Sequence, residues 1–555
     1  MTADRNHDSI ARLLVSCLEA EGVEYMFGIP GEENIRLVDA TAGSRIRFVL
    51  VRHEQAAAFM ADVYGRLTGK AGVCTATLGP GAINLALGVA DAQTDSSPLV
   101  AISAQVGLNR IYKESHQIVD LVSMYKPLTK WADILLSPAS TPEMVRKAFE
   151  VSQAERPGAV YLAIPEDLEA APAPKGTKPL TARPKHAAGP DPAQLEAAAK
   201  LIRRAKHPII LAGHGAARAH AGKLLTELSE VTGIPVATTF MGKGVISDRH
   251  PNALGVVGFM RHDFENFAFD RADLILAIGY ELQEFAPVRI NPKRDKAIVH
   301  IHRFAEDTDA SYPIAASIEA DIGRTLEALV QEFTAKPCPL YESESAIRAL
   351  HAAELQAGEN DTRFPLKPQR IVNDIRKALG DEDIVLVDTG AIKMWMARLY
   401  PAYAPLTCLI SNGLSTMAYS LPGALGAKLA KPNAKVLAAT GDGAFLMNSQ
   451  EIETAVREKI PLVVLVWVDN AYGLIKWKMD LELGHHRNVD FGNPDFVKYA
   501  ESFGAKGYQI EAAADLLPTL RKALGEDGVS VIACPVDYSE NVKLTDRLGA
   551  LTSPL

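Results

Sequence analysis

The chain alternates short, continuous apolar runs with longer amphipathic stretches, and this alternation constrains the fold more than any other feature. Apolar runs of this length predict buried strands, and apolar residues at helical spacing predict helices. A regular order of strand and helix predicts an α/β fold with doubly wound parallel sheets. We expect helices at 55–67 and 449–458, and strands at 46–51, 73–77, 98–103, 208–212, 235–238, 274–278, 297–301, 384–387, 435–439 and 462–468.

Two proline-containing stretches, 171–192 and 334–368, interrupt this pattern and are typical of linkers; the second surrounds a short helical piece at 345–356. A chain of 555 residues is also too long for a single core. The sequence therefore predicts three doubly wound parallel-sheet domains, at 1–170, 190–335 and 366–555. In such sheets ligands bind beyond the carboxyl ends of the strands, so the residues that follow each strand carry the functional information.

Composition excludes several classes of protein. The net charge is −9 and no block of like charge stands out, which argues against nucleic acid and anionic membrane as partners. The apolar runs are far shorter than the roughly twenty residues of a membrane span, and the first twenty residues lack a signal core. Five scattered cysteines without CxxC spacing argue against disulfide or zinc frameworks and favour a reduced cytoplasm.

A glycine-flanked acidic turn, Gly441-Asp442-Gly443-Ala444, follows the strand expected at 435–439. Its glycines allow backbone N–H groups to approach a phosphate closely, and Asp442 adds a hard oxygen ligand. Asp469 follows the strand at 462–468, 27 residues later, which is the length of one strand–helix–strand unit. The two carboxylates should therefore meet at adjacent strand ends, where they suit Mg²⁺. A plain turn and a helix cap would explain either acid alone, but the matched spacing favours the metal site.

These residues resemble the signature of the thiamine-diphosphate enzymes. Segment 388–391 (DTGA) matches their diphosphate-contacting loop, although Ile392 stands where many relatives carry His, and 411–422 (SNGLSTMAYSLP) is similar to the aminopyrimidine-contacting segment of acetohydroxyacid synthases. The resemblance implies that the Ser415 carbonyl accepts from the 4′-amino group and that Met417 separates the two cofactor rings, whereas core packing would be the ordinary role of such a methionine. It implies that Mg²⁺ is held by Asp442, Asp469 and Ala471. The cofactor contacts that it implies are Gly390, Ala391, Ser415, Met417, Gly441, Asp442, Gly443, Ala444, Asp469, Ala471, Tyr472, Gly473 and Leu474.

The strand at 46–51 leads into RHEQAA (52–57), where Glu54 by itself could simply start a helix. Together with GRLTGK (65–70) and LGPGAIN (78–84), however, this segment resembles the pyrimidine-binding domain of the same family, over most of 8–170. The resemblance implies that Glu54 binds the cofactor's ring nitrogen N1′ and so activates it. It also implies that each site is shared between subunits, which makes a homodimer the minimum active unit and a tetramer the expected assembly.

Segments 115–117 and 127–131 resemble the acetolactate synthases. Segments 467–475, 489–493 and 535–538 resemble the catabolic, FAD-independent branch of those enzymes. This resemblance places the amide of Gln117 near the reacting carbonyl, although a surface polar role is the simpler alternative. It implies that two pyruvates give 2-acetolactate and CO₂ through a thiamine diphosphate enamine. Lys478 stands where relatives carry Trp or Gln; it could select an anionic acceptor if it points inward, or it could be an ordinary solvated lysine.

Segment 279–285 (GYELQEF) replaces the GARFDDR-type segment with which biosynthetic acetohydroxyacid synthases bind FAD, and 213–215 (GHG) is only a fragment of a dinucleotide motif. We therefore expect no FAD. Three alternatives stay open: another thiamine-diphosphate 2-keto-acid decarboxylase or aldehyde carboligase, an FAD-containing acetohydroxyacid synthase large subunit, and a non-catalytic nucleotide-binding protein.

Overall fold

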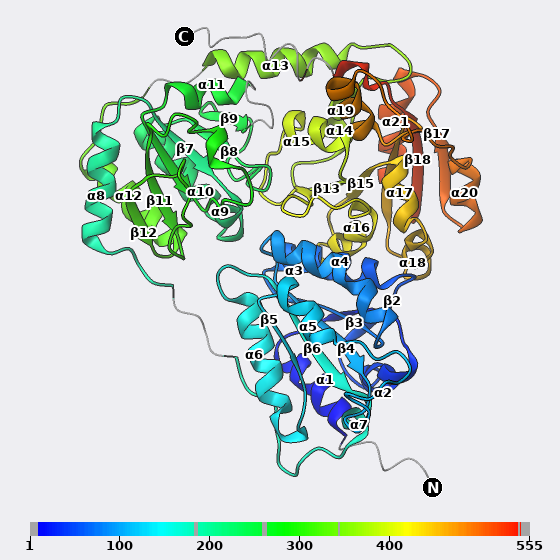
Figure 1. Cartoon of the computed structure of the whole chain (residues 1–555). Coiled ribbons are helices and arrows are strands. Elements are labelled where there is room, and N and C mark those ends of the chain that lie inside the picture. Colours follow the sequence, from blue (N-terminus) through cyan, green and yellow to red (C-terminus); the bar gives the residue numbers. More distant parts are fainter. Residues whose placement is uncertain (1–8, 183–186, 258–263, 342–344, 542–543, 545–555) are drawn as a thin grey trace. The chain divides into compact units, whose positions relative to one another are not determined.

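The computed structural model describes residues 9–182, 187–257, 264–341, 345–541 and 544. Within these residues the chain forms three six-stranded sheets, coloured in chain order in Figure 1. Neighbouring strands in each sheet are parallel. In each sheet the order of strands reverses direction along the chain, so that the connecting helices cover both faces. The predicted α/β class, with three doubly wound parallel sheets, is confirmed.

The first sheet has the order β2-β1-β3-β4-β6-β5. Its central strands are buried along their whole length, which explains their continuous apolar sequences. The strands are β1 (Tyr25–Gly28), β2 (Arg47–Leu50), β3 (Gly72–Ala76), β4 (Leu99–Gln105), β5 (Trp131–Ile134) and β6 (Ala159–Pro165). The helices are α1 (Ile10–Ala20), α2 (Ile35–Thr41), α3 (Glu54–Thr68), α4 (Pro80–Thr94), α5 (Leu121–Tyr125), α6 (Thr141–Gln153) and α7 (Glu166–Ala170).

The second sheet has the order β12-β11-β10-β7-β8-β9. Its strands are β7 (Pro208–Ala212), β8 (Val236–Thr238), β9 (Ala253–Val256), β10 (Leu274–Ile278), β11 (Ala297–His302) and β12 (Ile314–Glu319). The helices of this block are α8 (Pro192–Arg204), α9 (His214–Arg218), α10 (Gly222–Thr232), α11 (Phe264–Arg271) and α12 (Ile322–Ala335), and α13 (Ser345–Glu359) follows them.

The third sheet has the order β14-β13-β15-β16-β18-β17. Its strands are β13 (Ile384–Val387), β14 (Cys408–Ile410), β15 (Val436–Gly441), β16 (Leu462–Val468), β17 (Lys506–Gln509) and β18 (Val529–Pro535). The helices of this block are α14 (Pro368–Ala378), α15 (Ala391–Leu399), α16 (Ser420–Ala430), α17 (Asp442–Asn448), α18 (Glu451–Arg457), α19 (Gly473–Leu483), α20 (Phe496–Ser502) and α21 (Leu516–Gly525).

The chain separates into two compact units. The first unit contains Met1–Lys185 together with Gly413–Asn433 and Asn448–Pro461, and the second contains the rest. Helix α16 belongs to the first unit because it packs on α3: the Tyr419 ring lies edge-on against Phe59, and the Arg66 guanidinium lies over the same Tyr419 ring. Two segments of the last third of the sequence therefore fold with the first sheet.

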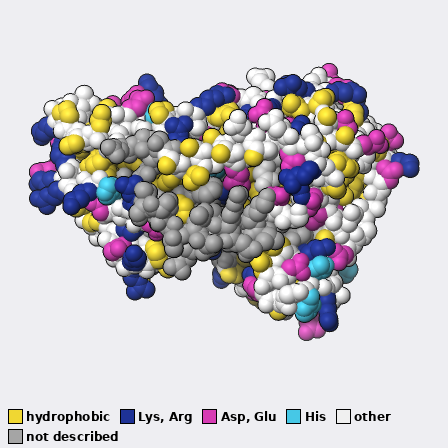
Figure 2. Space-filling model, turned by 90° about the horizontal axis from the view of Figure 1, so that it is seen from above, with side chains coloured by type: hydrophobic (Ala, Val, Ile, Leu, Met, Phe, Trp, Pro, Cys, Tyr) yellow, Lys and Arg dark blue, Asp and Glu magenta, His cyan; other side chains and the backbone are white. Residues whose placement is uncertain are grey.

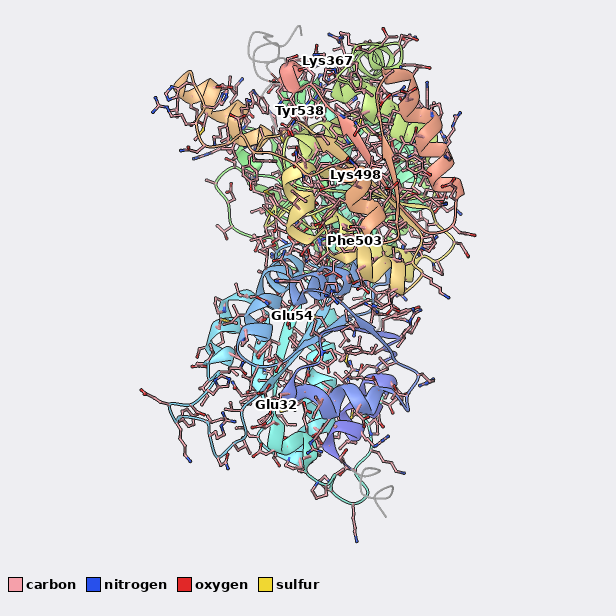
Figure 3. All side chains as sticks on the ribbon, turned by 90° about the vertical axis from the view of Figure 1, so that its right-hand side faces the viewer. Glu32, Glu54, Lys367, Lys498, Phe503 and Tyr538 are labelled. Carbon is pink, nitrogen blue, oxygen red and sulfur yellow. The ribbon has the colours of Figure 1, made fainter. Side chains whose placement is uncertain are left out.

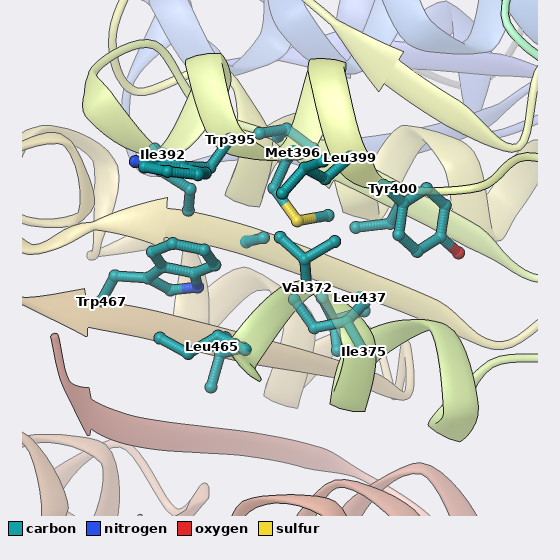
Figure 4. Close-up of a cluster of buried hydrophobic side chains, with 14 of the residues drawn as sticks. Val372, Ile375, Ile392, Trp395, Met396, Leu399, Tyr400, Leu437, Leu465 and Trp467 are labelled. Atoms are coloured by element: carbon teal, nitrogen blue, oxygen red, sulfur yellow. The ribbon is translucent and has the colours of Figure 1, made fainter. Parts of the chain in front are cut away.

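The core of the third sheet shows how the sequence places its largest apolar side chains. Figure 4 shows Trp467 and Leu465 of β16 facing Ile392 and Trp395 of α15, with further apolar residues of α14 beside them. Trp395 and Trp467 are both fully buried. Burial of such side chains stabilises the fold by about 1.5–3 kcal/mol each and fixes α15 on the sheet.

The structure also shows the burial of the cysteines, the surface charges of one face and the lengths of the helices. The five cysteines are free and buried. On the face shown in Figure 2, positive and negative side chains are interspersed. Within the described part of the chain, no helix is long and apolar enough to cross a membrane.

Candidate active site

In the second unit, Asp442 and Asp469 meet at the carboxyl ends of the adjacent strands β15 and β16, as their spacing predicts. Oδ2 of Asp442 accepts hydrogen bonds from the backbone N–H groups of Asp469, at 3.2 Å, and of Asn470, at 2.8 Å. The amide of Asn493 donates to the same oxygen at 2.8 Å. Burial raises the pKa of Asp442, and burial together with the Asp442 charge raises the pKa of Asp469 to about 7. The buried Asp442 and the half-buried Asp469 repel each other, and this arrangement fits a divalent cation, which would neutralise both.

This repulsion gives a pH-dependent prediction for the metal-free protein. Because the pKa of Asp469 is raised from its ordinary 3.8 to about 7, its contribution to stability is present at low pH and is lost as pH rises through 7. We expect Asp469→Asn, which removes this charge, to raise the melting temperature of the metal-free protein at pH 8 and to have little effect at pH 4. Thermal unfolding in the presence of a chelator checks this. Equal shifts at the two pH values would contradict it.

The loop after β16 packs against the acidic pair. A Cβ at Gly473 would overlap Oδ2 of Asp469, so this position requires glycine. Ala471 is buried and forms a bridge with Asp490, while the half-exposed Tyr472 lies edge-on to Phe491. Leu474 is partly buried one residue further on. The residues that the sequence assigns to the cofactor in this loop thus surround Asp469.

The loop after β13 lies beside the same strand ends. The buried Asp388 carboxylate accepts the Thr440 hydroxyl at 3.1 Å, which ties this loop to the turn that carries Asp442. Gly390 has φ of 142°, in the region that favours glycine, and α15 begins at Ala391. The structure therefore brings together Gly390, Ala391, Gly441, Asp442, Gly443, Ala444 and Asp469 at one edge of the third sheet.

In the first unit, Glu54 begins α3 directly after β2 (Figure 3). The side chain of His53 caps the helix by accepting the Gln55 N–H at 3.1 Å. Glu54 is 8% exposed, and its Oε2 accepts the Asn84 amide at 3.0 Å. A buried carboxyl with one neutral partner can bind a further hydrogen-bond donor, such as a protonated ring nitrogen.

Gln117 lies near the same corner of the first sheet. A Cβ at Gly79 would lie 3.0 Å from the Gln117 carbonyl, and a Cβ at Gly81 would lie 3.1 Å from Oε1 of Glu54. The N-terminal end of α4, at 79–81, is thus close to both residues. Gln117 is half-buried, and its φ of 58° is a left-handed conformation that is uncommon for non-glycine residues. The structure places these two sequence candidates next to the start of the same helix, α4.

Ser415 and Met417 lie on the segment that precedes α16. Ser415 has φ of 54° and Ala418 has φ of 69°, so two strained residues flank Met417. The Ala418 carbonyl accepts the buried Asn448 amide at 3.0 Å, which holds this conformation. Ser415 is exposed and Met417 is only half-buried, so Met417 is not an ordinary core residue.

Lys478 lies on α19, and its side chain is 67% exposed, with the ammonium 3.7 Å from the Glu482 carboxylate. In the described part of the structure, Lys478 contacts none of the site residues discussed above. Its exposed surroundings are those of an ordinary solvated lysine. A pocket of about 580 Å³ does adjoin Asp469 and Gly473. It is lined by Lys476 and Trp477 of α19 and by Tyr538, which Figure 3 labels.

Glu451, a residue that the sequence did not single out, holds the turn that carries Glu54. It is fully buried at the start of α18, and its Oε1 accepts the backbone N–H groups of Arg52 and His53, both at 3.0 Å. The Thr454 hydroxyl donates to its other oxygen at 2.6 Å. Burial raises the pKa of Glu451 to about 7. Glu451 is therefore a positioning residue for Glu54.

We expect Glu451→Ala to lower the free energy of unfolding by about 2–4 kcal/mol, because it removes a fully buried side chain that accepts two backbone N–H groups and the Thr454 hydroxyl. Urea unfolding measures this change. The matched control is Glu453→Ala on the same helix, whose partner is the half-exposed Arg457; it should change stability by at most about 0.5 kcal/mol. Equal effects of the two substitutions would remove the role assigned to Glu451.

Asn84, Glu451 and Asn493 were missed for a common reason. Each is a polar residue that acts through another residue, and only tertiary contacts reveal its partner. A weak signal was present for Asn493, since it ends the segment 489–493 that marks one branch of the resemblance. For Glu451 the sequence offers only its position nine residues after Asp442, which indicates nothing by itself.

Comparison with known proteins agrees with this arrangement. Three family profiles match the chain: "Thiamine pyrophosphate enzyme, N-terminal TPP binding domain" at 8–124, the central domain of the same enzymes at 195–329, and their C-terminal TPP binding domain at 388–534. The acetolactate synthase of Bacillus subtilis is 36% identical over 97% of this chain and 95% of its own length. A catabolic acetolactate synthase of Raoultella terrigena is 36% identical over 97% of each chain. A probable acetolactate synthase large subunit of Methanococcus aeolicus is 34% identical over 98% of this chain and 94% of its own.

The chain carries Asp442 and Asp469 at adjacent strand ends and Glu54 at the start of α3. It also matches the family profiles and these relatives along nearly its whole length. Together these findings define one class of protein. The chain belongs to the thiamine pyrophosphate enzyme family.

Proposed function

We propose that this protein is an acetolactate synthase that condenses two pyruvates to 2-acetolactate with loss of CO₂. The observation that carries the proposal is the pair of Asp442, which is buried, and Asp469, which is half-buried, at adjacent strand ends, in a chain that aligns along nearly its whole length with acetolactate synthases. In this proposal the enzyme has three functional domains: 1–170 binds the pyrimidine, 190–335 is the central domain, and 366–555 binds the diphosphate and the metal.

The residues fit thiamine diphosphate and Mg²⁺. Asp442, Asp469 and the Ala471 carbonyl would hold Mg²⁺ against the diphosphate, with the glycines around Asp442 giving the phosphates room. When bound, thiamine diphosphate supplies the carbanion and the electron sink that decarboxylation needs. Glu54 holds a proton at the cofactor's ring nitrogen N1′, and Gln117 offers its amide to the reacting carbonyl of the substrate.

The geometry of the first unit supports a site that is shared between two copies of the chain. Glu54 contacts Asn84 near the start of α4, whereas the Gly413 N–H donates to Asp95 just beyond the end of that helix, at 2.6 Å. Eleven helical residues separate these points by about 16 Å. Ser415 therefore lies toward the opposite end of α4 from Glu54, too far for both to contact one pyrimidine ring. This supports a homodimer as the minimum active unit, and we expect a tetramer.

The decisive experiment incubates purified protein with pyruvate, thiamine diphosphate and Mg²⁺, without FAD, and identifies the products. Acetolactate that disappears when cofactor or metal is withheld is the expected result. CO₂ with acetaldehyde would replace the proposal with a 2-keto-acid decarboxylase. The exposed position of Lys478 removes the main reason to expect an acceptor other than pyruvate.

We infer that the proposed enzyme works without FAD, and the packing of the turn after β7 supports this. The backbone N–H of His214 donates to the Glu284 carboxyl group at 2.9 Å, and the Thr239 hydroxyl donates to it at 2.5 Å. A Cβ at Gly215 would overlap the His302 ring, so the turn itself is closely packed. In dinucleotide-binding folds, N–H groups in this position bind phosphate.

We expect the purified protein to show no stoichiometric flavin in its absorption spectrum and to need no added FAD for full turnover. A one-to-one flavin content would contradict this prediction and would favour the FAD-containing large-subunit alternative. The buried, free cysteines support a reducing compartment, and we infer the cytoplasm.

A further inference from the structure

A second pocket of the second unit lies away from the residues assigned to the cofactor. Its volume is about 240 Å³. Three parts of the chain line it: the stretch from the end of β8 into β9, helix α13, and the end of α15 with the residues that follow. The charged side chains and the histidine in this lining are Lys243, Asp248, Arg249, Arg348, His351 and Arg398.

This pocket is distinct from the diphosphate site. Helix α15 connects the two, because it begins next to Gly390 and reaches the pocket with Arg398 and Leu399. Eight helical residues separate its ends by about 12 Å. A ligand in this pocket would therefore not contact the diphosphate loop.

Two of the four strongly basic side chains in the lining already have carboxylate partners. Arg398 contacts Glu354 at 2.8 Å. Arg249 pairs with Asp381 and stacks on the Tyr403 ring, with its guanidinium 3.5 Å from the ring centre. These two arginines are neutralised by the protein itself and build the wall of the pocket.

The other two, Lys243 and Arg348, have no carboxylate partner among the described residues. Lys243 is only 4% exposed, and no hydrogen bond of its ammonium to another described group is present. Arg348 donates one hydrogen bond, to the Pro251 carbonyl at 2.7 Å. The one carboxylate in the lining, Asp248, accepts the Ala402 N–H at 2.8 Å. A buried ammonium without a paired anion is costly, and among the described lining residues the single carboxylate of Asp248 leaves an excess of positive charge.

We propose that this pocket binds a small oxyanion, a carboxylate or a phosphate, between Lys243 and Arg348. Its volume is below the roughly 300–1,000 Å³ of pockets for drug-sized ligands, so a small anion fits better than a nucleotide. A lysine and an arginine that face one pocket supply the charge-assisted hydrogen bonds that such an anion needs.

Calorimetric titration of the holoenzyme with inorganic phosphate, and separately with acetate, at constant ionic strength tests this proposal. The protein is first saturated with thiamine diphosphate and Mg²⁺, so that phosphate cannot bind at the cofactor site. We expect one saturable site for at least one of the two anions, and the anion that binds identifies the class. Lys243→Met should weaken this binding at least about tenfold, since it removes a charged hydrogen bond.

The matched control is Lys223→Met, in the same block of the chain, whose side chain is 88% exposed and pairs with Glu227. It should leave the affinity unchanged. Arg348→Met is the second variant if Lys243→Met does not fold, and it should weaken binding in the same direction. Absence of binding by both anions, or an affinity that is the same in the wild type and in the pocket variants, would overturn the proposal.

Discussion

Glu54→Gln should abolish most turnover of pyruvate while leaving the affinity for thiamine diphosphate nearly unchanged. Glutamine keeps the size of the side chain and can still pair with Asn84, so α3 and its capped start should form as before. It cannot hold a proton as a carboxyl group does, and loss of acid–base function of this kind typically costs about 10²–10⁴-fold in rate. The expected result is therefore a fall in kcat of that size with little change in the dissociation constant of the cofactor.

Glu32→Gln provides the matched control. Glu32 lies in the same unit, as Figure 3 shows, and is exposed at the start of a short 3₁₀ helix. Its substitution should leave both kcat and cofactor affinity unchanged. If Glu54→Gln retained near-normal turnover, Glu54 would not be the activating group, although the fold and the metal site would be unaffected by that result.

The sequence predicted many of the buried strands from their apolar runs, but it did not predict β6 and β18, which are also long, apolar and buried. β7, β10, β13 and β16 follow the predicted runs closely, and α3 differs by one residue at each end. The edge strands β5, β12 and β17 were not predicted, because they are partly exposed and carry polar residues, so they lack a continuous apolar run. Edge strands are recognised by their neighbours in the sheet rather than by their own sequence.

The folding of α16 and α18 with the first sheet could not have been predicted either. It depends on contacts across hundreds of residues, such as that between Glu451 and the backbone of His53, which no local pattern encodes. The acidic pair, in contrast, was predictable because strand order fixes it. Two residues that end adjacent parallel strands must lie together, so the spacing of Asp442 and Asp469 was enough. Spacing in the sequence thus predicts where side chains at the ends of strands lie. The residues that hold those side chains in place can be identified only from the tertiary structure.

Asp442→Asn should weaken Mg²⁺-dependent binding of thiamine diphosphate on the order of 100-fold or more. One oxygen of Asp442 accepts three hydrogen bonds, from the N–H groups of Asp469 and Asn470 and from the Asn493 amide. Asparagine removes a negative charge from the metal and can turn an NH₂ group toward these donors, so it harms both the metal site and the turn. Breaking a buried charged contact of this kind costs about 3–5 kcal/mol, which corresponds to the expected loss of affinity.

Titration of Mg²⁺ and thiamine diphosphate into the variant, followed by intrinsic fluorescence, measures this loss. Asp527→Asn, an exposed aspartate of the same unit, is the control and should bind as the unmodified protein does. Asp469→Asn distinguishes the effect of lost charge from the effect of a disturbed turn. It keeps an oxygen that can bind the metal, and it relieves the repulsion that raises the pKa of this pair. Its loss of affinity should therefore be clearly smaller than that of Asp442→Asn. If the two variants bound cofactor equally weakly, the metal would depend on total charge alone, and the hydrogen bonds that converge on Asp442 would have no part in holding it.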